Sequence, residues 1–334
     1  MMPLLDADPY EHDPGKWGAS LVNAAEILFP CLDAVGARSV AEVGAYAGDL
    51  TGQLVNWADH AGARVIAIDP SPEPQLVELD EQRPDLELVR KTSHEALRDL
   101  VLPDAVIIDG DHNYYTVSEE LRLIGDNARG ADLPLLLFHD VGWPHARRDT
   151  YFDPEQIPEE HRQPIAEPAG LFPGEPGVVE GALLFHYGAE REGGPRNGVL
   201  TAVEDFMKSR GGLRLVTIPV FFGFGVMWHT DAPWAAAVAE IVEPWDRNPL
   251  LQRLEANRVY HLASVHREIV RNAMLESRLA RLESRLARQE QLLNALLDSG
   301  ALAMADRVAA LRHPRRATSW RDQISNALGE NGSA

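Results

Sequence analysis

The sequence is short of cysteine, of long hydrophobic runs and of concentrated positive charge, and each shortage excludes a class of protein. Cys31 is the only cysteine, so no internal disulfide can form, which is the usual situation in a reducing cytoplasm. No apolar run reaches the length of a membrane span, and the acidic, proline-broken N-terminus does not resemble a signal peptide. We therefore expect a soluble, cytoplasmic protein without a membrane partner.

Negative charge dominates the composition. The formal net charge of −20 argues against a nucleic-acid partner, because a phosphate backbone would be repelled unless a basic face were segregated. The most basic stretch, His313 to Arg316 together with Arg321, is short, and we expect it to be a solvated terminus. The 334 residues suit one large domain with an appendage.

From residue 39 onward, apolar runs alternate with amphipathic stretches, which is the pattern of a parallel α/β sheet. We predict strands at 39–43, 65–68, 86–89, 105–108 and 133–138, with helices at about 49–60, 73–82, 94–101 and 115–128. The pattern resumes with a helix at 198–210 and strands at 213–220 and 221–229, which can form an antiparallel hairpin at one edge. The expected fold is α/β, with a doubly wound, seven-stranded, mostly parallel Rossmann-like sheet and a long C-terminal helix.

Residues 141–197 interrupt this alternation. The segment holds too much proline and glycine for regular elements, yet it keeps several aromatic side chains that a disordered linker would lack. We expect an ordered, irregular excursion that acts as a substrate-side lid, and a mobile insertion without a role is the alternative. Within it, Arg147 and Arg148 either bind a phosphate or sugar acid or pair with Asp149 or Asp153.

A heptad repeat marks the C-terminal part of the chain. LESRLAR occurs twice in succession, at 275–281 and 282–288. The repeat spaces apolar residues at alternating intervals of four and three: Leu275, Leu279, Leu282 and Leu286, and, after an interruption at Gln289, Leu293 and Leu296. This spacing predicts a helix through which the chain forms a homo-oligomer, with flanking arginines and glutamates selecting the partner by charge. A helix that packs on its own catalytic domain would show the same stripe.

Two glycines follow the first predicted strand, in the order Glu42-Val-Gly44-Ala-Tyr-Ala-Gly48, and Asp69 ends the second strand. Glycines at this turn let the backbone approach a ligand, and a carboxylate after the second strand can accept both hydroxyls of a ribose. A dinucleotide site needs GxGxxG, whereas only two glycines occur here, separated by three residues. A pyrophosphate would also be disfavoured beside Glu42 and Asp49, whereas a sulfonium cation would not.

The ExGxxxG turn, Asp69 and the expected strand order resemble class I S-adenosylmethionine-dependent methyltransferases over roughly residues 39–230. The resemblance implies S-adenosylmethionine as the cofactor. It also implies a cofactor role for each matching residue: Glu42 and Gly44 near the methionine moiety, Gly48 lining the turn, Asp69 on the ribose, Thr92 and Ser93 beside the adenine, and Asp109 toward the methyl group.

Carboxylates also end two later strands. Asp109 and Asp140 each follow a predicted buried strand, at the edge where open α/β sheets bind ligands, and His112 lies three residues after Asp109. Two carboxylates and an imidazole at one edge can hold a divalent cation and accept a proton. Each residue also has a structural interpretation, with Asp109 capping a turn, His112 in a surface loop and His139 hydrogen-bonded in the core.

The segments Asp109-Gly-Asp111-His112 and His139-Asp140 are similar to paired motifs of metal-dependent sugar O-methyltransferases from natural-product pathways. The resemblance implies that Asp109 and Asp140 bind magnesium and that His112 is the general base, with an ordinary pKa of about 6 to 7. His139 stands where that family has an acidic residue. As a third ligand it would also allow manganese or catalytic zinc.

Taken together, the sequence predicts an enzyme that methylates a hydroxyl on a sugar or glycosylated small molecule. A methyltransferase for phenolic or catechol diols is one alternative, because a metal chelates adjacent oxygens in either case. An inactive cofactor-binding scaffold that works through its C-terminal helix is another. The expected organisation is an N-terminal helical segment at 1–38, a methyltransferase domain at 39–230 that includes the lid at 141–197, a heptad helix at 247–300 and a tail at 301–334.

Overall fold

The computed structural model describes residues 20–128, 130–312 and 318–331. These residues form two compact units, the first ending at Arg267 and the second beginning at Glu268. The predicted N-terminal helical segment lies partly outside the described residues. Its described part holds η2 (Leu21–Ala24) and α1 (Ala25–Val35).

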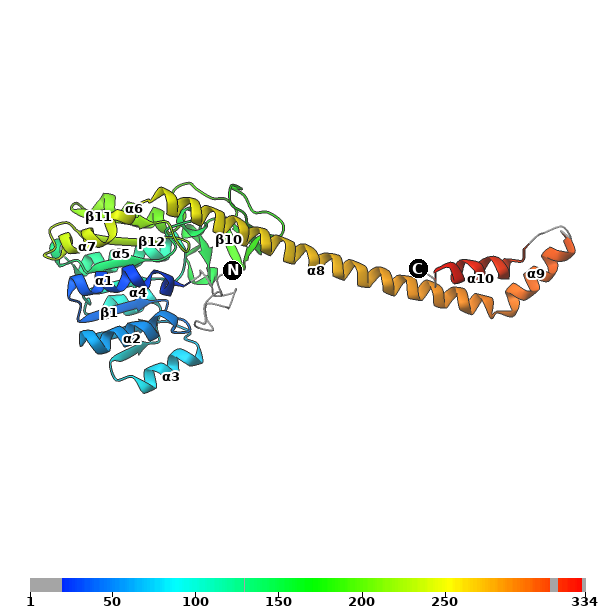
Figure 1. The fold of residues 1–334 in the computed structure, drawn as a ribbon, viewed down its shortest axis with the longest axis horizontal. Helices are drawn as coiled ribbons and strands as arrows, with labels where there is room; N and C mark the ends of the chain where they lie inside the picture. The colour runs from blue at the N-terminus through cyan, green and yellow to red at the C-terminus, as the bar shows by residue number, and fades with distance from the viewer. Residues whose placement is uncertain (1–19, 129, 313–317, 332–334) are drawn as a thin grey trace, which may run out of the picture. The chain divides into compact units, whose positions relative to one another are not determined.

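A seven-stranded sheet forms the centre of the first unit (Figure 1). The strands are β1 (Ser39–Val43), β2 (Arg64–Ile68), β3 (Leu86–Val89), β4 (Ala105–Ile108), β5 (Leu135–Phe138), β11 (Leu213–Ile218) and β12 (Phe224–His229). Their order is β3-β2-β1-β4-β5-β12-β11, and β12 runs antiparallel to both of its neighbours. The predicted α/β class, the seven-stranded mostly parallel sheet and the terminal hairpin are confirmed.

Helices cover both faces of this sheet. They are α2 (Asp49–Ala61), α3 (Pro74–Gln82), α4 (Ser93–Asp99), α5 (Tyr114–Asn127), α6 (Val199–Ser209) and α7 (Ala235–Val242). Alternate strand residues point to opposite layers. Val40 and Ile107 pack in a core with α1, α2 and α7, whereas Ala41 and Ile108 pack in a core with α4, α5 and α6. The central strands β2, β4 and β5 are buried on both faces, which explains their apolar runs.

The register of the strands aligns the residues that follow them. Val43 on β1 lies beside Ile108 on β4, and Ile108 lies beside Phe138 on β5. Because these strands are parallel, their carboxyl ends meet at one edge of the sheet. The turns that begin with Gly44, Asp109 and His139 therefore start next to one another.

The excursion at 141–197 contains short strands, so the expectation that it lacks regular elements is wrong. β6 (Thr150–Tyr151), β7 (Ile165–Ala166) and β10 (Tyr187–Ala189) form a three-stranded sheet, and β8 (Ala169–Leu171) pairs with β9 (Leu183–Phe185). Several residues of these short strands, among them Thr150, Ala169 and Ala189, are buried. Strand pairing supplies the hydrogen bonds that their peptide groups require.

The first part of α8 (Pro249–Leu297) belongs to the first unit. Val259 and Ala263 pack in a third apolar cluster with Phe172 and Leu183 of the excursion and Phe222 of the turn before β12. The start of this helix therefore supports the excursion.

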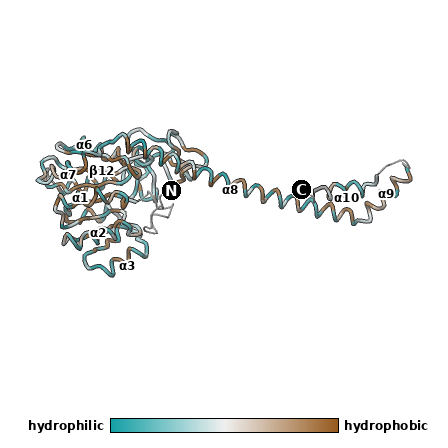
Figure 2. The backbone as a smooth tube through the Cα atoms, viewed as in Figure 1, coloured by the Kyte–Doolittle hydropathy of each residue, from teal (hydrophilic) through white to brown (hydrophobic). Residues whose placement is uncertain are grey.

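The second unit contains the rest of α8, α9 (Gly300–Arg312) and α10 (Trp320–Asn331), so the range predicted as a tail includes two helices. The basic residues His313 to Arg316 lie outside the described residues. The Asp306 carboxylate accepts hydrogen bonds from the backbone N–H groups of Trp320 and Arg321 and thereby caps α10. Hydrophobic and hydrophilic residues alternate along α8 (Figure 2). Within the described ranges, no helix is long and apolar enough to span a bilayer.

Candidate active site

The turn after β1 lies against the turn after β4. Gly44 has a φ of +86°, and a Cβ at this position would collide with the Asp109 carbonyl and lie 2.6 Å from the Cα of Gly110. The Asp109 N–H donates to the Val43 carbonyl at 2.9 Å, which fixes the two turns together. Glycine is therefore required at 44 for both its conformation and its size.

The Asp69 carboxylate holds the glycine turn in place. Its Oδ2 accepts a hydrogen bond from the Tyr46 N–H and its Oδ1 accepts one from the Ser71 N–H, both at 2.8 Å. The side chain is buried, and each oxygen keeps a further lone pair for a ligand hydroxyl. Gly48, with a φ of +84°, lies where a Cβ would be 3.3 Å from Leu76 of α3. Both residues thus shape the predicted cofactor turn.

Glu42 is buried beneath this turn. Its Oε2 accepts a hydrogen bond from the Thr51 hydroxyl at 2.6 Å. Burial raises the pKa of Glu42 to about 8, the Thr51 hydrogen bond opposes this, and the charges of Asp109, Asp49 and Asp69 add to it. The charges of Asp109, Asp49 and Asp69 therefore act together around this turn, as the argument for a cationic ligand requires, while Glu42 itself is protonated at neutral pH.

Thr92 and Ser93 begin α4. The Thr92 side chain accepts from the Glu95 N–H while the Glu95 carboxylate accepts from the Thr92 N–H, so the predicted capping box is present. The capping box explains Thr92 structurally, and the adenine contact remains a prediction.

The structure adds Glu120 of α5, which sequence reasoning missed. Its carboxylate is buried and neither oxygen has a hydrogen-bond partner among the described residues. Burial raises the pKa of Glu120 to about 8. Its Oε1 lies 3.8 Å from the place that a Cβ at Gly110 would take, so the carboxylate lies beside the turn after β4. The sequence carried one signal for this residue: Glu120 lies on the apolar face of α5 with Val117 and Leu121, where a charged side chain is unusual.

Asp109, His112 and Asp140 converge after β4 and β5. One ligand atom from each lies within 4.8 Å of the others. His112 Nδ1 lies 2.8 Å from Asp140 Oδ2, and the His112 ring is half-buried whereas Asp140 is buried. Asp140 has a φ of +60°, a conformation that costs a non-glycine residue energy and is common at functional sites.

His139 has both ring nitrogens engaged. Nε2 lies 2.8 Å from the Phe221 carbonyl, which can only accept, so Nε2 carries a proton. Nδ1 lies 2.9 Å from Asp109 Oδ1 and 3.3 Å from Asp140 Oδ2. Burial lowers the pKa of His139, but the two carboxylates outweigh it and raise the pKa well above its ordinary value. His139 therefore compensates the charge of the two aspartates, and His112 is the histidine that the geometry groups with them.

His145 was also missed from the sequence. Its Nδ1 lies 2.8 Å from the Thr150 hydroxyl, and its Nε2 lies 3.8 Å from Asp140 Oδ1. The ring lies against that of His112, with centroids 4.6 Å apart. Burial, opposed by Asp140 and reinforced by His112 and His139, lowers the pKa of His145 to about 3, so this ring is neutral. It forms the inner wall of the cluster.

The pKa of His112 differs from the ordinary value that the sequence suggested. Burial lowers it, but Asp140, Asp109 and Asp111 together raise it to about 9. Without a cation, His112 is therefore protonated at neutral pH. Any ligand that offsets the aspartate charges favours its neutral form.

Asp111 and Asp149 tie the excursion to the site. Asp111 accepts from the Phe152 N–H at 3.0 Å and from the Asn113 side chain at 2.6 Å. Asp149 accepts from the Tyr114 N–H at 2.8 Å and from the Gly198 N–H at 2.6 Å, and burial raises its pKa to about 6. Both carboxylates act as structural anchors.

The two arginines of the excursion bind elsewhere in the fold. Arg147 forms a two-point ion pair with Glu204 of α6, at 2.8 and 2.7 Å. Arg148 is buried and donates to the carbonyls of Ala189 and Pro176. The expected pairing with Asp149 or Asp153 is wrong, and these contacts give both arginines structural roles.

No protein-family model and no curated protein matches this sequence. Among solved structures, the chain is similar to a methyltransferase from Podospora anserina with S-adenosylhomocysteine bound, at 13% identity over 64% of this chain and 80% of that one, with a TM-score of 0.38. Human N-acetylserotonin methyltransferase is 11% identical over 63% of this chain and 52% of that one, so the match spans about half of its length (TM-score 0.35). A Burkholderia thailandensis 1,6-didemethyltoxoflavin N1-methyltransferase is 14% identical over 67% of this chain and 90% of that one, with a TM-score of 0.32.

These likenesses concern the fold alone. The strand order, with one antiparallel strand inserted beside the last, is itself typical of class I S-adenosylmethionine-dependent methyltransferases. The chain therefore has a methyltransferase-like fold.

Proposed function

We propose that this protein is an S-adenosylmethionine-dependent O-methyltransferase that methylates a hydroxyl of a sugar or glycosylated small molecule, assisted by a divalent cation. The observation that carries the proposal is the contact between Gly44 and the Asp109–Gly110 backbone. It makes the predicted cofactor turn and the cluster of Asp109, His112 and Asp140 adjoin each other. A methyl donor and an activated hydroxyl must meet within van der Waals distance, which this arrangement permits.

The cofactor turn suits a cation better than a phosphate. Asp49, Asp69 and Asp109 lie close enough to this turn for their negative charges to raise the pKa of Glu42 within it. A sulfonium and an α-amino group are stabilised in such a field, whereas a pyrophosphate is repelled. Asp69 would bind the ribose with its remaining lone pairs, since its two backbone hydrogen bonds already fix its orientation.

The donor set fits a hard divalent cation. Asp109 and Asp140 would supply carboxylate oxygens, which magnesium and manganese prefer, while His112 beside them stays free of the cation as the proposed base. A cation held there would lower the pKa of an acceptor hydroxyl. His139 would be the third donor: its Nε2 is bonded to the Phe221 carbonyl, so its Nδ1 would face the cation once the cation had displaced the proton that the aspartates stabilise there.

His112 is oriented to accept the proton. Its Nδ1 faces Asp140, which leaves Nε2 as the basic atom of the ring. In the step we propose, the acceptor O–H proton moves to His112 Nε2, the oxygen forms a bond to the methyl carbon, and the carbon–sulfur bond breaks. Its electron pair stays on sulfur, which yields S-adenosylhomocysteine.

The assay follows labelled methyl groups from S-adenosylmethionine into two panels, sugar-containing compounds and catechols, with and without EDTA. We expect labelling of the sugar panel that EDTA abolishes and magnesium restores, and no labelling by Asp140→Asn. Labelling of catechols alone would show that the acceptor is a phenolic diol and not a sugar. Cofactor binding without labelling of either panel would favour an inactive cofactor-binding scaffold. Full activity in the presence of EDTA would show that the reaction does not depend on a metal.

A further inference from the structure

An exposed apolar stripe runs along α8 in the second unit. Leu275, Leu279, Leu282 and Leu286 are between 49% and 57% exposed. Val259 and Ala263, near the start of the helix, are its buried residues in the part of the chain that the structure describes. A 49-residue helix is far longer than the usual 10 to 14 residues and gains its stability from packing partners, which makes this stripe an interaction surface.

The stripe has the register of a coiled coil. Leu275, Leu282, Gln289 and Leu296 occupy d positions, and Asn272, Leu279, Leu286 and Leu293 occupy a positions. Leucine fills six of these eight seam positions. A lone asparagine at an a position is a feature that sets register and strand number, because its amide is satisfied only by the matching asparagine of the partner.

The charges beside the seam specify direction. The e positions are Glu276, Glu283 and Glu290; the g positions that face them in the preceding heptads are Arg271, Arg278 and Arg285, and the last g position is Leu292. In a parallel pair, each g residue faces the e residue of the next heptad on the partner, so the three charged contacts along each edge all join arginine to glutamate. In an antiparallel pair, g faces g and e faces e, which would set arginine against arginine and glutamate against glutamate.

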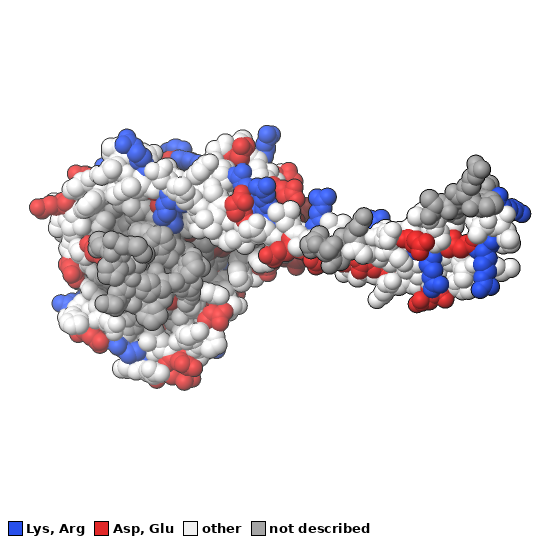
Figure 3. Space-filling model, turned by 45° about the vertical axis from the view of Figure 1, so that its right-hand side comes forward, with Lys and Arg blue, Asp and Glu red and all other residues white. Residues whose placement is uncertain are grey.

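Most of these charges form no ion pair with another residue that the structure describes. Among the described residues, Arg278, Arg285, Glu276, Glu283 and Glu290 form no ion pair, whereas Arg271 has an exposed one with Glu268 at 3.8 Å. Acidic and basic side chains lie close together along this unit (Figure 3). Their pairing capacity is therefore available to a second chain.

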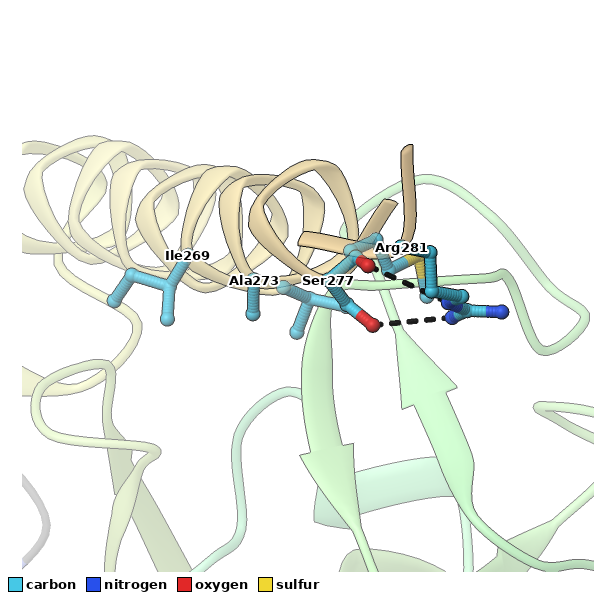
Figure 4. Close-up of a pocket in the computed structure, with 6 residues that line it drawn as sticks. Ile269, Ala273, Ser277 and Arg281 are labelled. Carbon is cyan, nitrogen blue, oxygen red and sulfur yellow. Dashed lines mark hydrogen bonds between the residues drawn. The ribbon is translucent and has the colours of Figure 1, made fainter. Parts of the chain in front are cut away.

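A shallow hollow on α8 lies off this seam. Its lining comes entirely from the one helix: Ile269, Val270, Ala273, Met274, Ser277 and Arg281, of which Ile269, Ala273 and Ser277 point from one side and Arg281 folds back to the Ser277 hydroxyl (Figure 4). These residues occupy b, c, e and f positions. A single helix face does not enclose a ligand, so the hollow does not compete with the seam.

We propose that α8 pairs with α8 of a second copy of this chain as a parallel, in-register, two-stranded coiled coil over residues 271–296. Parallel chains bring Asn272 against Asn272 and place the arginine and glutamate rows in alternating contact along both edges.

Cysteine cross-linking tests direction and register. The full-length variants Leu275→Cys and Gln289→Cys place a thiol at two d positions, and Ser284→Cys places one at an f position on the outer face. Cys31 is buried, so it does not contribute. We expect both d variants to form disulfide-linked dimers under mild oxidation and the f variant to stay reduced. Cross-linking at one d position alone would indicate an antiparallel pair and overturn the proposal, as would no cross-linking.

Charge reversal tests the pairing rule. Replacing all three e glutamates by arginine should raise the dimer dissociation constant about 100-fold or more, because six attractive contacts become repulsive. The control replaces the f residues Ser277, Ser284 and Gln291 by arginine and should change the constant by less than about threefold. Mixing the e variant with a chain whose three g arginines are glutamate should restore dimers. Light scattering that gives one or three wild-type chains per particle would contradict the proposal.

Discussion

The backbone of Asp109 lies directly against Gly44, so closely that the structure has no room for a side chain at position 44. This contact joins the turn that would hold the methyl donor to the residue that begins the acid–imidazole cluster. Under the proposed function, cofactor binding and activation of the acceptor would therefore be coupled through this one backbone contact.

We predict that Gly44→Ala disrupts this junction. The added methyl group would force the two turns apart at a φ of +86°, so we expect a stability loss of about 2 kcal/mol or more and weak S-adenosylmethionine binding. The matched control is Gly52→Ala in α2, where a Cβ meets nothing within 4 Å and stability should rise by roughly 0.5 to 1 kcal/mol. Urea unfolding and calorimetry measure both. Normal binding by Gly44→Ala would show that the turns are independent.

A second prediction concerns the buried Glu42. Its pKa of about 8 in the folded state exceeds its ordinary value, so the folded protein holds this proton more tightly than the unfolded chain does. The resulting stability is present at low pH and is lost as the pH rises through about 8, by on the order of 1 to 4 kcal/mol. Glu42→Gln keeps an acceptor for Thr51 and should flatten the decline in urea midpoint between about pH 5 and pH 8. Glu95→Gln, an exposed control, should keep the wild-type decline. Equal slopes for wild type and Glu42→Gln would refute the assignment.

Metal binding should depend on particular carboxylates of the cluster. Asp140→Asn removes an anionic ligand and should weaken Mn²⁺ binding by about 100-fold or more, as followed by electron paramagnetic resonance of the free ion. Asp111→Asn is the control on the same turn. Its side chain still accepts from the Phe152 N–H, so Mn²⁺ affinity should stay within a few-fold. If both variants bind Mn²⁺ as wild type does, the cation does not occupy this cluster.

The general-base role of His112 predicts a pH-dependent rate. In the cation-free protein the carboxylates hold its pKa at about 9, and a bound cation should offset them, so turnover should rise with pH with a midpoint below 9. His112→Ala should lose this rise and slow turnover by roughly two to four orders of magnitude, whereas His60→Ala on α2 should match wild type. A variant at 112 with near-normal turnover would assign proton removal to another group.

Much of the fold was predictable from the sequence because its strands are buried on both faces. The runs at 65–68 and 105–108 are uninterrupted apolar segments, and the structure places β2 and β4 over these residues. The excursion was harder because its strands are only two or three residues long and pair across distant parts of the segment. Periodicity needs longer windows than these strands provide.

Site residues that directly follow a strand could be predicted from the sequence. Site residues that reach the cluster only through tertiary contacts could not. Asp109 and Asp140 follow β4 and β5, so their meeting follows from parallel register. His145 and Glu120 reach the site through the path of the excursion and the buried face of α5, which no local motif marks. The pKa of His112 depends on three surrounding carboxylates, which spacing alone does not quantify.

The most direct test of the account is calorimetric titration of S-adenosylmethionine into the wild-type protein, Asp69→Ala and Asp109→Ala. We predict one site per wild-type chain and a loss of roughly 2 to 4 kcal/mol for Asp69→Ala, which is about 30-fold to 800-fold in Kd, because charge-assisted hydrogen bonds to the ribose are removed. Asp109→Ala should bind much closer to wild type, since its side chain mainly serves the cation. No binding by the wild-type chain, or equal affinities for the two variants, would contradict the proposed cofactor site.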